Sequence, residues 1–131
     1  MLILRLDTAN TVIVTATEKA TLDDPVWLFQ FKNQTTGDSV YCIATDVSDY
    51  DYRYNKFVIT ETSSPNNLNG EVDLVEAGLY DYFVYEQEST TNLDPDLATS
   101  LCEQGFMRVA VTTAPYANYD DQDKTYTVYN G

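Results

Sequence analysis

Apolar side chains recur at every second position along most of this sequence. Residues 2–6, 27–31 and 40–44 show the pattern, in which one set of apolar side chains alternates with a second set. A repeat of two residues puts alternate side chains on opposite faces of an extended strand, whereas an amphipathic helix has a repeat near 3.6 residues. The runs are rich in β-branched and aromatic residues, and polar turns separate them. The sequence therefore predicts about eight strands and an all-β fold, either a sandwich or a barrel.

The segments between the predicted strands carry turn-forming residues. Residues 34–38 include Gly37 and join two strong strands, so 25–45 is predicted to be a hairpin. Residues 63–70 contain a proline, three asparagines and Gly70, which is typical of a connecting loop.

One short helix is expected between two of the strands. Asp94 can cap its N-terminus, and Pro95 suits its first position. Leu97 and Leu101 lie one helical turn apart, and Gly105 can end the helix.

A local signal favours a sandwich over a barrel. The string EAGLYDY fits the acid-x-Gly-x-Tyr pattern of a tyrosine corner, with Glu76, Gly78 and Tyr80 at the pattern positions. In that corner the tyrosine hydroxyl bonds to upstream backbone at the start of strand F. Trp27 suits the core between two sheets, and Tyr82 stands where an immunoglobulin domain has its second cysteine. These residues predict an immunoglobulin-like antiparallel β-sandwich without the usual disulfide. The alternative is an ordinary glycine turn before an aromatic strand.

The charge of the chain restricts its partners. Its 131 residues include 7 basic and 21 acidic side chains, a net charge of −14, and no histidine. One domain is expected over residues 1–111, followed by a tail over 112–131. The negative charge argues against binding nucleic acid or an anionic membrane. Without histidine there is no Ser-His-Asp or Cys-His nucleophile, so we expect no enzyme and no cofactor. The N-terminus lacks a basic leader, so no signal peptide is predicted.

The sequence contains two cysteines and two acidic clusters that are candidates for a disulfide or a metal site. Cys42 and Cys102 are too few for a disulfide framework and are expected to be free thiols in the core, with a disulfide as the alternative. Loop carboxylates can coordinate Ca²⁺, but neither acidic cluster has EF-hand spacing, so solvated acidic loops are expected. The two clusters comprise Asp46, Asp49 and Asp51, and Asp120, Asp121 and Asp123.

Tyrosine is the most informative residue type for function. Of the 11 tyrosines, several lie outside the strongest predicted core strands, and tyrosine is enriched where proteins bind other proteins. They are candidate partner-interface residues, with a role as lids on the open ends of the sandwich as the alternative. A last strand over 125–129 either returns to its own sheet or adds to the sheet of a neighbouring copy. The candidates are Tyr50, Tyr52, Tyr54, Tyr116, Tyr119, Tyr126 and Tyr129.

A family resemblance is carried by the segments 26–33, 39–44, 53–61, 78–87, 92–95 and 103–105. In these segments the chain resembles small virion proteins of tailed bacteriophages, of the kind encoded beside capsid genes in phages of Bacteroidetes hosts, including the crAss-like group. The resemblance implies a compact β domain bound in many copies to an icosahedral shell, as an auxiliary or decoration protein. Its partner would be the major capsid protein or another virion protein, and it would be found in virions assembled in the host cytoplasm.

Other functions stay open at the level of sequence. A tail, neck or head-fibre component is a close variant of the capsid role. A carbohydrate-binding immunoglobulin-like module on the particle surface is a second class. A regulator that mimics nucleic acid through its negative charge is a third, although here the acids are scattered rather than spaced along one face.

Overall fold

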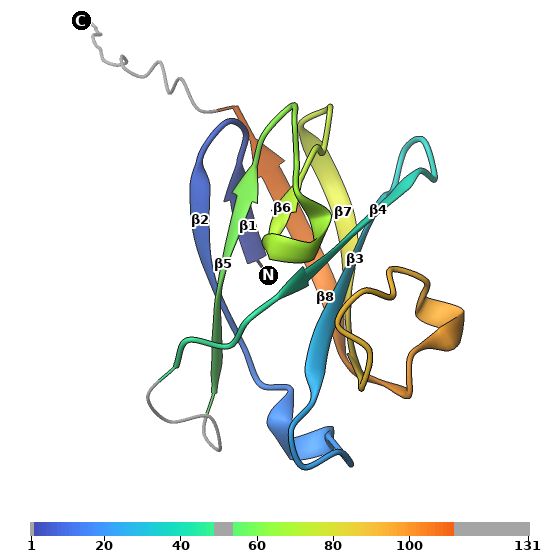
Figure 1. The fold of residues 1–131 in the computed structure, drawn as a ribbon. Coiled ribbons are helices and arrows are strands. Elements are labelled where there is room, and N and C mark those ends of the chain that lie inside the picture. The colour runs from blue at the N-terminus through green and yellow to red at the C-terminus, as the bar shows by residue number, and fades with distance from the viewer. Residues whose placement is uncertain (1, 49–53, 112–131) are drawn as a thin grey trace, which may run out of the picture.

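A computed structural model describes residues 2–48 and 54–111, which form two sheets packed face to face (Figure 1). A five-stranded sheet has the order β1-β8-β7-β3-β4, and a three-stranded sheet has the order β2-β5-β6. The all-β sandwich predicted from the alternation is therefore confirmed. The strands are β1 (Leu2–Arg5), β2 (Ala9–Val14), β3 (Val26–Asn33), β4 (Ser39–Ala44), β5 (Asn55–Glu61), β6 (Glu71–Val72), β7 (Gly78–Gln87) and β8 (Ser100–Ala110).

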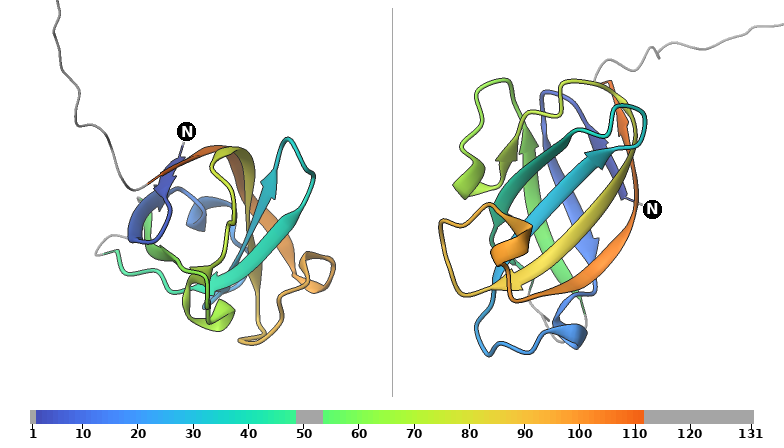
Figure 2. Two further views of the ribbon diagram at one scale, coloured as in Figure 1. Left: turned by 90° about the horizontal axis from the view of Figure 1, so that it is seen from above. Right: turned by 90° about the vertical axis from the view of Figure 1, so that its right-hand side faces the viewer.

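The strand order resembles that of an immunoglobulin-like domain, except that β6 follows β5 in the chain and pairs with it in parallel. β3, β7 and β8 take the places of strands C, F and G, β4 lies beside β3 like C′, and β2 and β5 pair like B and E. Most neighbours are antiparallel, including the hairpin β3–β4. Two pairs are parallel, namely β1 with β8 and β5 with β6. Because β1 joins β8, it lies in the sheet opposite β2 (Figure 2).

The core lies between the sheets and is centred on aromatic rings. Phe57 of β5 meets Phe29 edge-on, with ring centroids 4.8 Å apart, and Trp27 edge-on at 6.3 Å. Trp27 is only 5% exposed, at the core position proposed for it from sequence. These edge-to-face contacts join the two sheets, because Phe57 lies in one and the other two rings in the second.

The segment before β7 forms the hydrogen bonds of a tyrosine corner. The Tyr80 hydroxyl donates to the backbone oxygens of Leu74 at 2.8 Å and Glu76 at 2.7 Å. Gly78 has a φ of +140°, a conformation that favours glycine. Glu76 therefore contributes its backbone oxygen to the corner.

The predicted short helix is a single 3₁₀ turn, η3 (Pro95–Leu97). Asp94 caps it by accepting from the Asp96 N–H at 3.0 Å, as the sequence indicates. The predicted continuation to Gly105 is wrong, because Thr99 N–H donates to the Glu86 oxygen at 2.8 Å and draws the chain into β8. Two other 3₁₀ turns are η1 (Thr17–Lys19) and η2 (Asn67–Asn69).

No helix within the described ranges is long and apolar enough to cross a bilayer. The predicted tail, 112–131, with its expected terminal strand, lies outside the described residues.

Candidate functional site

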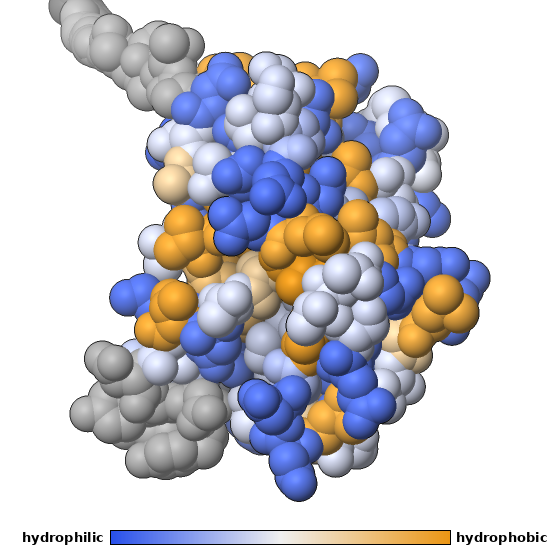
Figure 3. All heavy atoms as spheres, viewed as in Figure 1, coloured by the Kyte–Doolittle hydropathy of each residue, from blue (hydrophilic) through white to orange (hydrophobic). Residues whose placement is uncertain are grey.

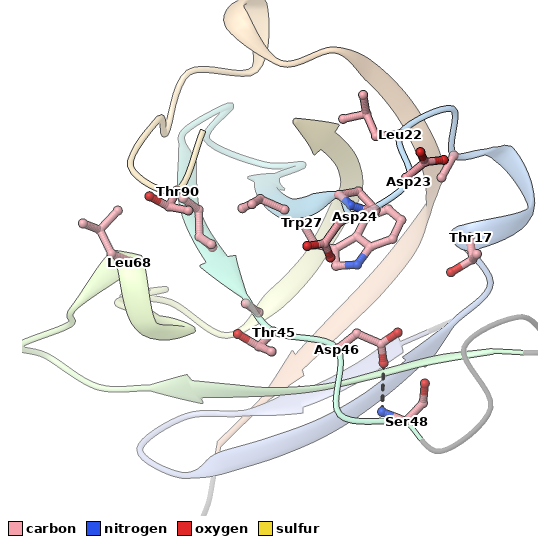
Figure 4. Close-up of a pocket in the computed structure, with 15 residues that line it drawn as sticks. Thr17, Leu22, Asp23, Asp24, Trp27, Thr45, Asp46, Ser48, Leu68 and Thr90 are labelled. Atoms are coloured by element: carbon pink, nitrogen blue, oxygen red, sulfur yellow. Dashed lines mark hydrogen bonds between the residues drawn. The ribbon is translucent and has the colours of Figure 1, made fainter. Parts of the chain in front are cut away.

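Three loops meet at one end of the sandwich and enclose a hollow of about 660 Å³ (Figure 4). They are the β2–β3 loop, the described part of the β4–β5 loop, and the β7–β8 loop, which contributes Thr90. Leu68 of η2 closes one side. In variable immunoglobulin domains, loops at one end of the sandwich form the binding surface. The hollow lies at such a loop end and is therefore the candidate site.

The hollow is acidic and has an aromatic wall. Figure 4 shows the carboxylates of Asp23, Asp24 and Asp46 around the Trp27 indole. None of its described lining residues is basic. Since Asp23 and Asp24 are exposed, their charges face whatever approaches this end. The arrangement suits a cationic group of a partner, which would meet several carboxylates beside apolar surface.

Asp46 is held rigidly at the rim. Its Oδ1 accepts from the backbone N–H groups of Ser48 at 2.9 Å and Lys56 at 3.1 Å, and its Oδ2 accepts from Asn55 Nδ2 at 2.7 Å. Burial raises the pKa of Asp46, but these donors outweigh burial and lower the pKa below 3.8. Asp46 is therefore ionised at neutral pH.

The β2–β3 loop is anchored by Glu86, a fully buried carboxylate at the end of β7. Its Oε1 accepts from the N–H groups of Thr21 at 2.8 Å and Leu22 at 2.9 Å, and the Ser100 hydroxyl bonds to its Oε2. Burial raises the pKa of Glu86, but the donors from Ser100, Leu22 and Thr21 together lower it below 4.5. An ionised Glu86 thus holds the loop that carries Asp23.

A second buried side chain, Asn55, fixes the start of the same loop. Its Oδ1 accepts from the N–H groups of Ala16 at 2.8 Å and Thr17 at 3.0 Å. Because its Nδ2 also donates to Asp46, one amide joins two of the three loops. The rim of the hollow is consequently preorganised, which lowers the entropic cost of binding a partner.

Of the candidate interface tyrosines, only Tyr54 lies within the described residues, where it is partly buried just before β5. It belongs to the β4–β5 loop, at the same end as the hollow. Those outside the described residues are Tyr50, Tyr52, Tyr116, Tyr119, Tyr126 and Tyr129.

The acidic clusters are also largely outside the described residues, since Asp46 is the one member within them. Across 2–48 and 54–111, no group of three or more His, Cys, Asp or Glu side chains is arranged to hold a metal ion. Cys42 and Cys102 are free and buried, as expected.

Sequence reasoning missed three carboxylates. Asp23 and Asp24 stand directly before Pro25 and the strand that carries Trp27, and this acidic pair at a strand entry was the available signal. Glu86 continues the inward-facing series of β7 after Val84, so a charge at a core position of the alternation could have revealed it.

No protein-family model matches the chain, and no curated protein has a matching sequence.

Proposed function

We propose that the protein is a non-enzymatic structural protein of a bacteriophage particle. In this role it is an auxiliary capsid protein that docks on the major capsid protein and reinforces the shell. The observation that carries the proposal is the convergence of three loops on a preorganised acidic hollow. The resemblance of the sequence to small virion proteins supports the identity of the partner.

The docking chemistry follows from the charge of this end. Asp23, Asp24 and Asp46 favour a basic segment on the partner, and their field speeds the encounter at low salt. Tyr54 lies on one of the rim loops and adds contact area of a kind enriched in interfaces. Binding by this end leaves the two sheets intact, so the domain adds contact area between shell subunits without rearranging.

Quantitative mass spectrometry of purified particles from the source tests the proposal. The chain is counted against the major shell protein. A ratio near one, or a simple fraction of one, is the expected result. A few to a few dozen copies per particle would instead assign the protein to the portal, tail or fibres, and its absence from particles would overturn the structural role.

A charge-removal variant tests the docking end. In Asp23→Asn/Asp24→Asn, association with the purified shell protein should slow, and the dependence of its rate on salt should weaken. The matched control, Asp7→Asn/Glu76→Gln, removes the same charge at the opposite end and should bind like the parent protein. Equal effects of the two variants would show that only net charge matters and that the hollow is not the docking site.

A further inference from the structure

β2 is an edge strand whose outer side is open in the described part of the chain. The Glu61 N–H donates to the Thr8 oxygen at 3.0 Å, so residue 8 faces β5. Peptide groups point alternately to the two sides of an antiparallel strand. The backbone N–H and C=O groups of Ala9, Thr11 and Ile13 therefore point away from β5, toward the outside of the sheet.

The sequence of β2 carries none of the features that normally protect an edge. It reads ANTVIV, without a charge, a proline or a glycine. Both edges of the five-stranded sheet, β4 and β1, are covered. At β4, the oxygen of Tyr41 accepts from Asn67 Nδ2 and the oxygen of Ile43 accepts from the Gly70 N–H, both at 2.7 Å. These bonds place η2 and Gly70 against the outer edge of β4, and Figure 1 shows the η2 turn next to this strand.

The edge of β1 is capped in a similar way. Asn10 Oδ1 accepts from the Arg5 N–H at 2.9 Å, and Asn10 Nδ2 donates to the Arg5 oxygen at 3.1 Å. In constant-type immunoglobulin domains, strand A lies beside strand B. Here β1 lies in the other sheet, so none of the strands in residues 2–48 and 54–111 occupies the corresponding place beside β2.

The charge pattern around β2 favours a second copy of this chain as the occupant. Two chains of net charge −14 repel each other and can approach closely only where carboxylates are absent. β2 is uncharged, and Lys56 lies opposite Ile13 on β5. The surface is also apolar, since Ile13 is 56% and Val58 44% exposed. Figure 3, in the view of Figure 1, shows apolar residues interspersed with hydrophilic ones.

We propose that two copies pair through β2, antiparallel about a two-fold axis at Thr11, to form one continuous sheet with three strands from each copy. The outward peptide groups determine the register. Thr11 lies opposite Thr11 of the second copy, and Ala9 lies opposite Ile13 of the second copy. Because the strands run in opposite directions, the two acidic loop ends point apart, which limits their repulsion. This inference does not depend on the capsid role.

Cysteine cross-linking of the full chain tests both the pairing and its register. Thr11→Cys brings two thiols to facing positions whose Cα atoms are about 5.5 Å apart, within disulfide range. We expect mild oxidation to give a covalent dimer on a non-reducing gel. The matched control, Ala9→Cys, faces isoleucine and should remain monomeric on the gel. Equal cross-linking of both variants, or none with Thr11→Cys, overturns the proposal.

Solution mass measured by light scattering provides an independent readout. The parent chain should form dimers that strengthen with salt, because salt screens the repulsion between acidic copies. Thr11→Lys places two ammonium groups at the axis and should give monomers, whereas Leu79→Lys on the other sheet should still dimerise. A parent chain that stays monomeric at millimolar concentration overturns the proposal. Loss of the dimer in Thr127→Pro would also overturn the proposal, because residue 127 belongs to the tail. That result would show that the tail, and not β2 of the second copy, pairs with the edge of β2.

Discussion

The ring of Tyr82 in β7 lies directly over Gly105, its partner in β8. A Cβ atom added to Gly105 would stand 2.9 Å from the Cε1 and hydroxyl oxygen atoms of Tyr82, closer than real Cβ contacts come. The glycine therefore leaves the space that the ring fills. Tyr82 is buried where an immunoglobulin domain has its second cysteine, so an aromatic ring on a glycine occupies the position of the usual disulfide.

We expect Gly105→Ala to lower the free energy of unfolding by about 1–3 kcal/mol, because the methyl group displaces a buried ring. Chemical denaturation measures the change. Gln104→Ala, an exposed neighbour on β8, should stay within about 0.5 kcal/mol of the parent. In a Tyr82→Leu background the added cost of the alanine should shrink, and an undiminished cost would contradict the contact.

Val75 adopts a strained backbone conformation before the tyrosine corner. Its φ is +66°, and the Glu76 N–H donates to the Leu74 oxygen at 2.6 Å across it, which makes a γ-turn of the rare positive-φ form. The side chain is 73% exposed, so little packing offsets the strain. Val75→Gly should raise the free energy of unfolding by roughly 0.5–1 kcal/mol, since glycine adopts this φ without steric cost.

Val47→Gly is the control for this substitution, because Val47 is similarly exposed and has a negative φ. It should lose stability through the greater freedom of glycine in the unfolded chain. Both variants are compared by thermal and denaturant unfolding, and a Val75→Gly protein less stable than the parent would contradict the strain.

Acid should weaken the fold through Glu86 and Asp46. In both carboxyl groups the pKa is lower in the folded state than in the unfolded chain, so each contributes stability that is fully present above its unfolded-state pKa. That stability is lost as the pH falls through the folded-state pKa values, because protonation then favours the unfolded chain. When unfolding is measured from pH 7 to pH 3, the denaturant concentration at the midpoint should therefore decrease once the pH is below about 4.5.

Glu86→Gln should flatten this acid dependence and cost roughly 1–3 kcal/mol at pH 7, because the amide cannot accept from all the donors that face it. Glu88→Gln, an exposed neighbour two residues along, serves as its control and should leave the profile unchanged. An unchanged profile in Glu86→Gln would show that other groups dominate acid unfolding.

The thiols should be unreactive in the folded protein. Burial raises the pKa of Cys42 to about 12, and burial followed by the charge of Glu86 raises the pKa of Cys102. Since the thiolate is the reactive form, a disulfide reagent at pH 8 should label neither thiol until denaturant unfolds the chain. Ala9→Cys adds one exposed thiol as a positive control. Rapid labelling of the parent chain would contradict the burial.

Much of the fold could be read from short-range patterns. The alternation in 27–31 placed Trp27 on the inward face of a strand, because the period of two is a local property of the extended chain. Asp94 and Pro95 marked the η3 turn through their side-chain chemistry. The extent of that turn could not be read in the same way, because β7 offers residues 100–110 a long partner strand that outweighs local helix signals.

The candidate site was harder to predict, because its parts are distant along the chain. Asp23 and Asp46 carried no joint signal, and they share a hollow only because β3 and β4 return the chain to the same end of the sandwich. The organising role of Glu86 likewise depends on a loop 64 residues away in sequence.

The sequence by itself determined that this chain forms strands, which faces of them turn inward and where Tyr80 makes its corner, since these depend on neighbours within a few residues. Tertiary structure alone decided that β1 joins β8 in parallel, that β2 is an edge strand among the described residues, and that three loops enclose an acidic hollow. Those features depend on which distant strands pair, and pairing is selected by the packing of the whole core rather than by any local pattern.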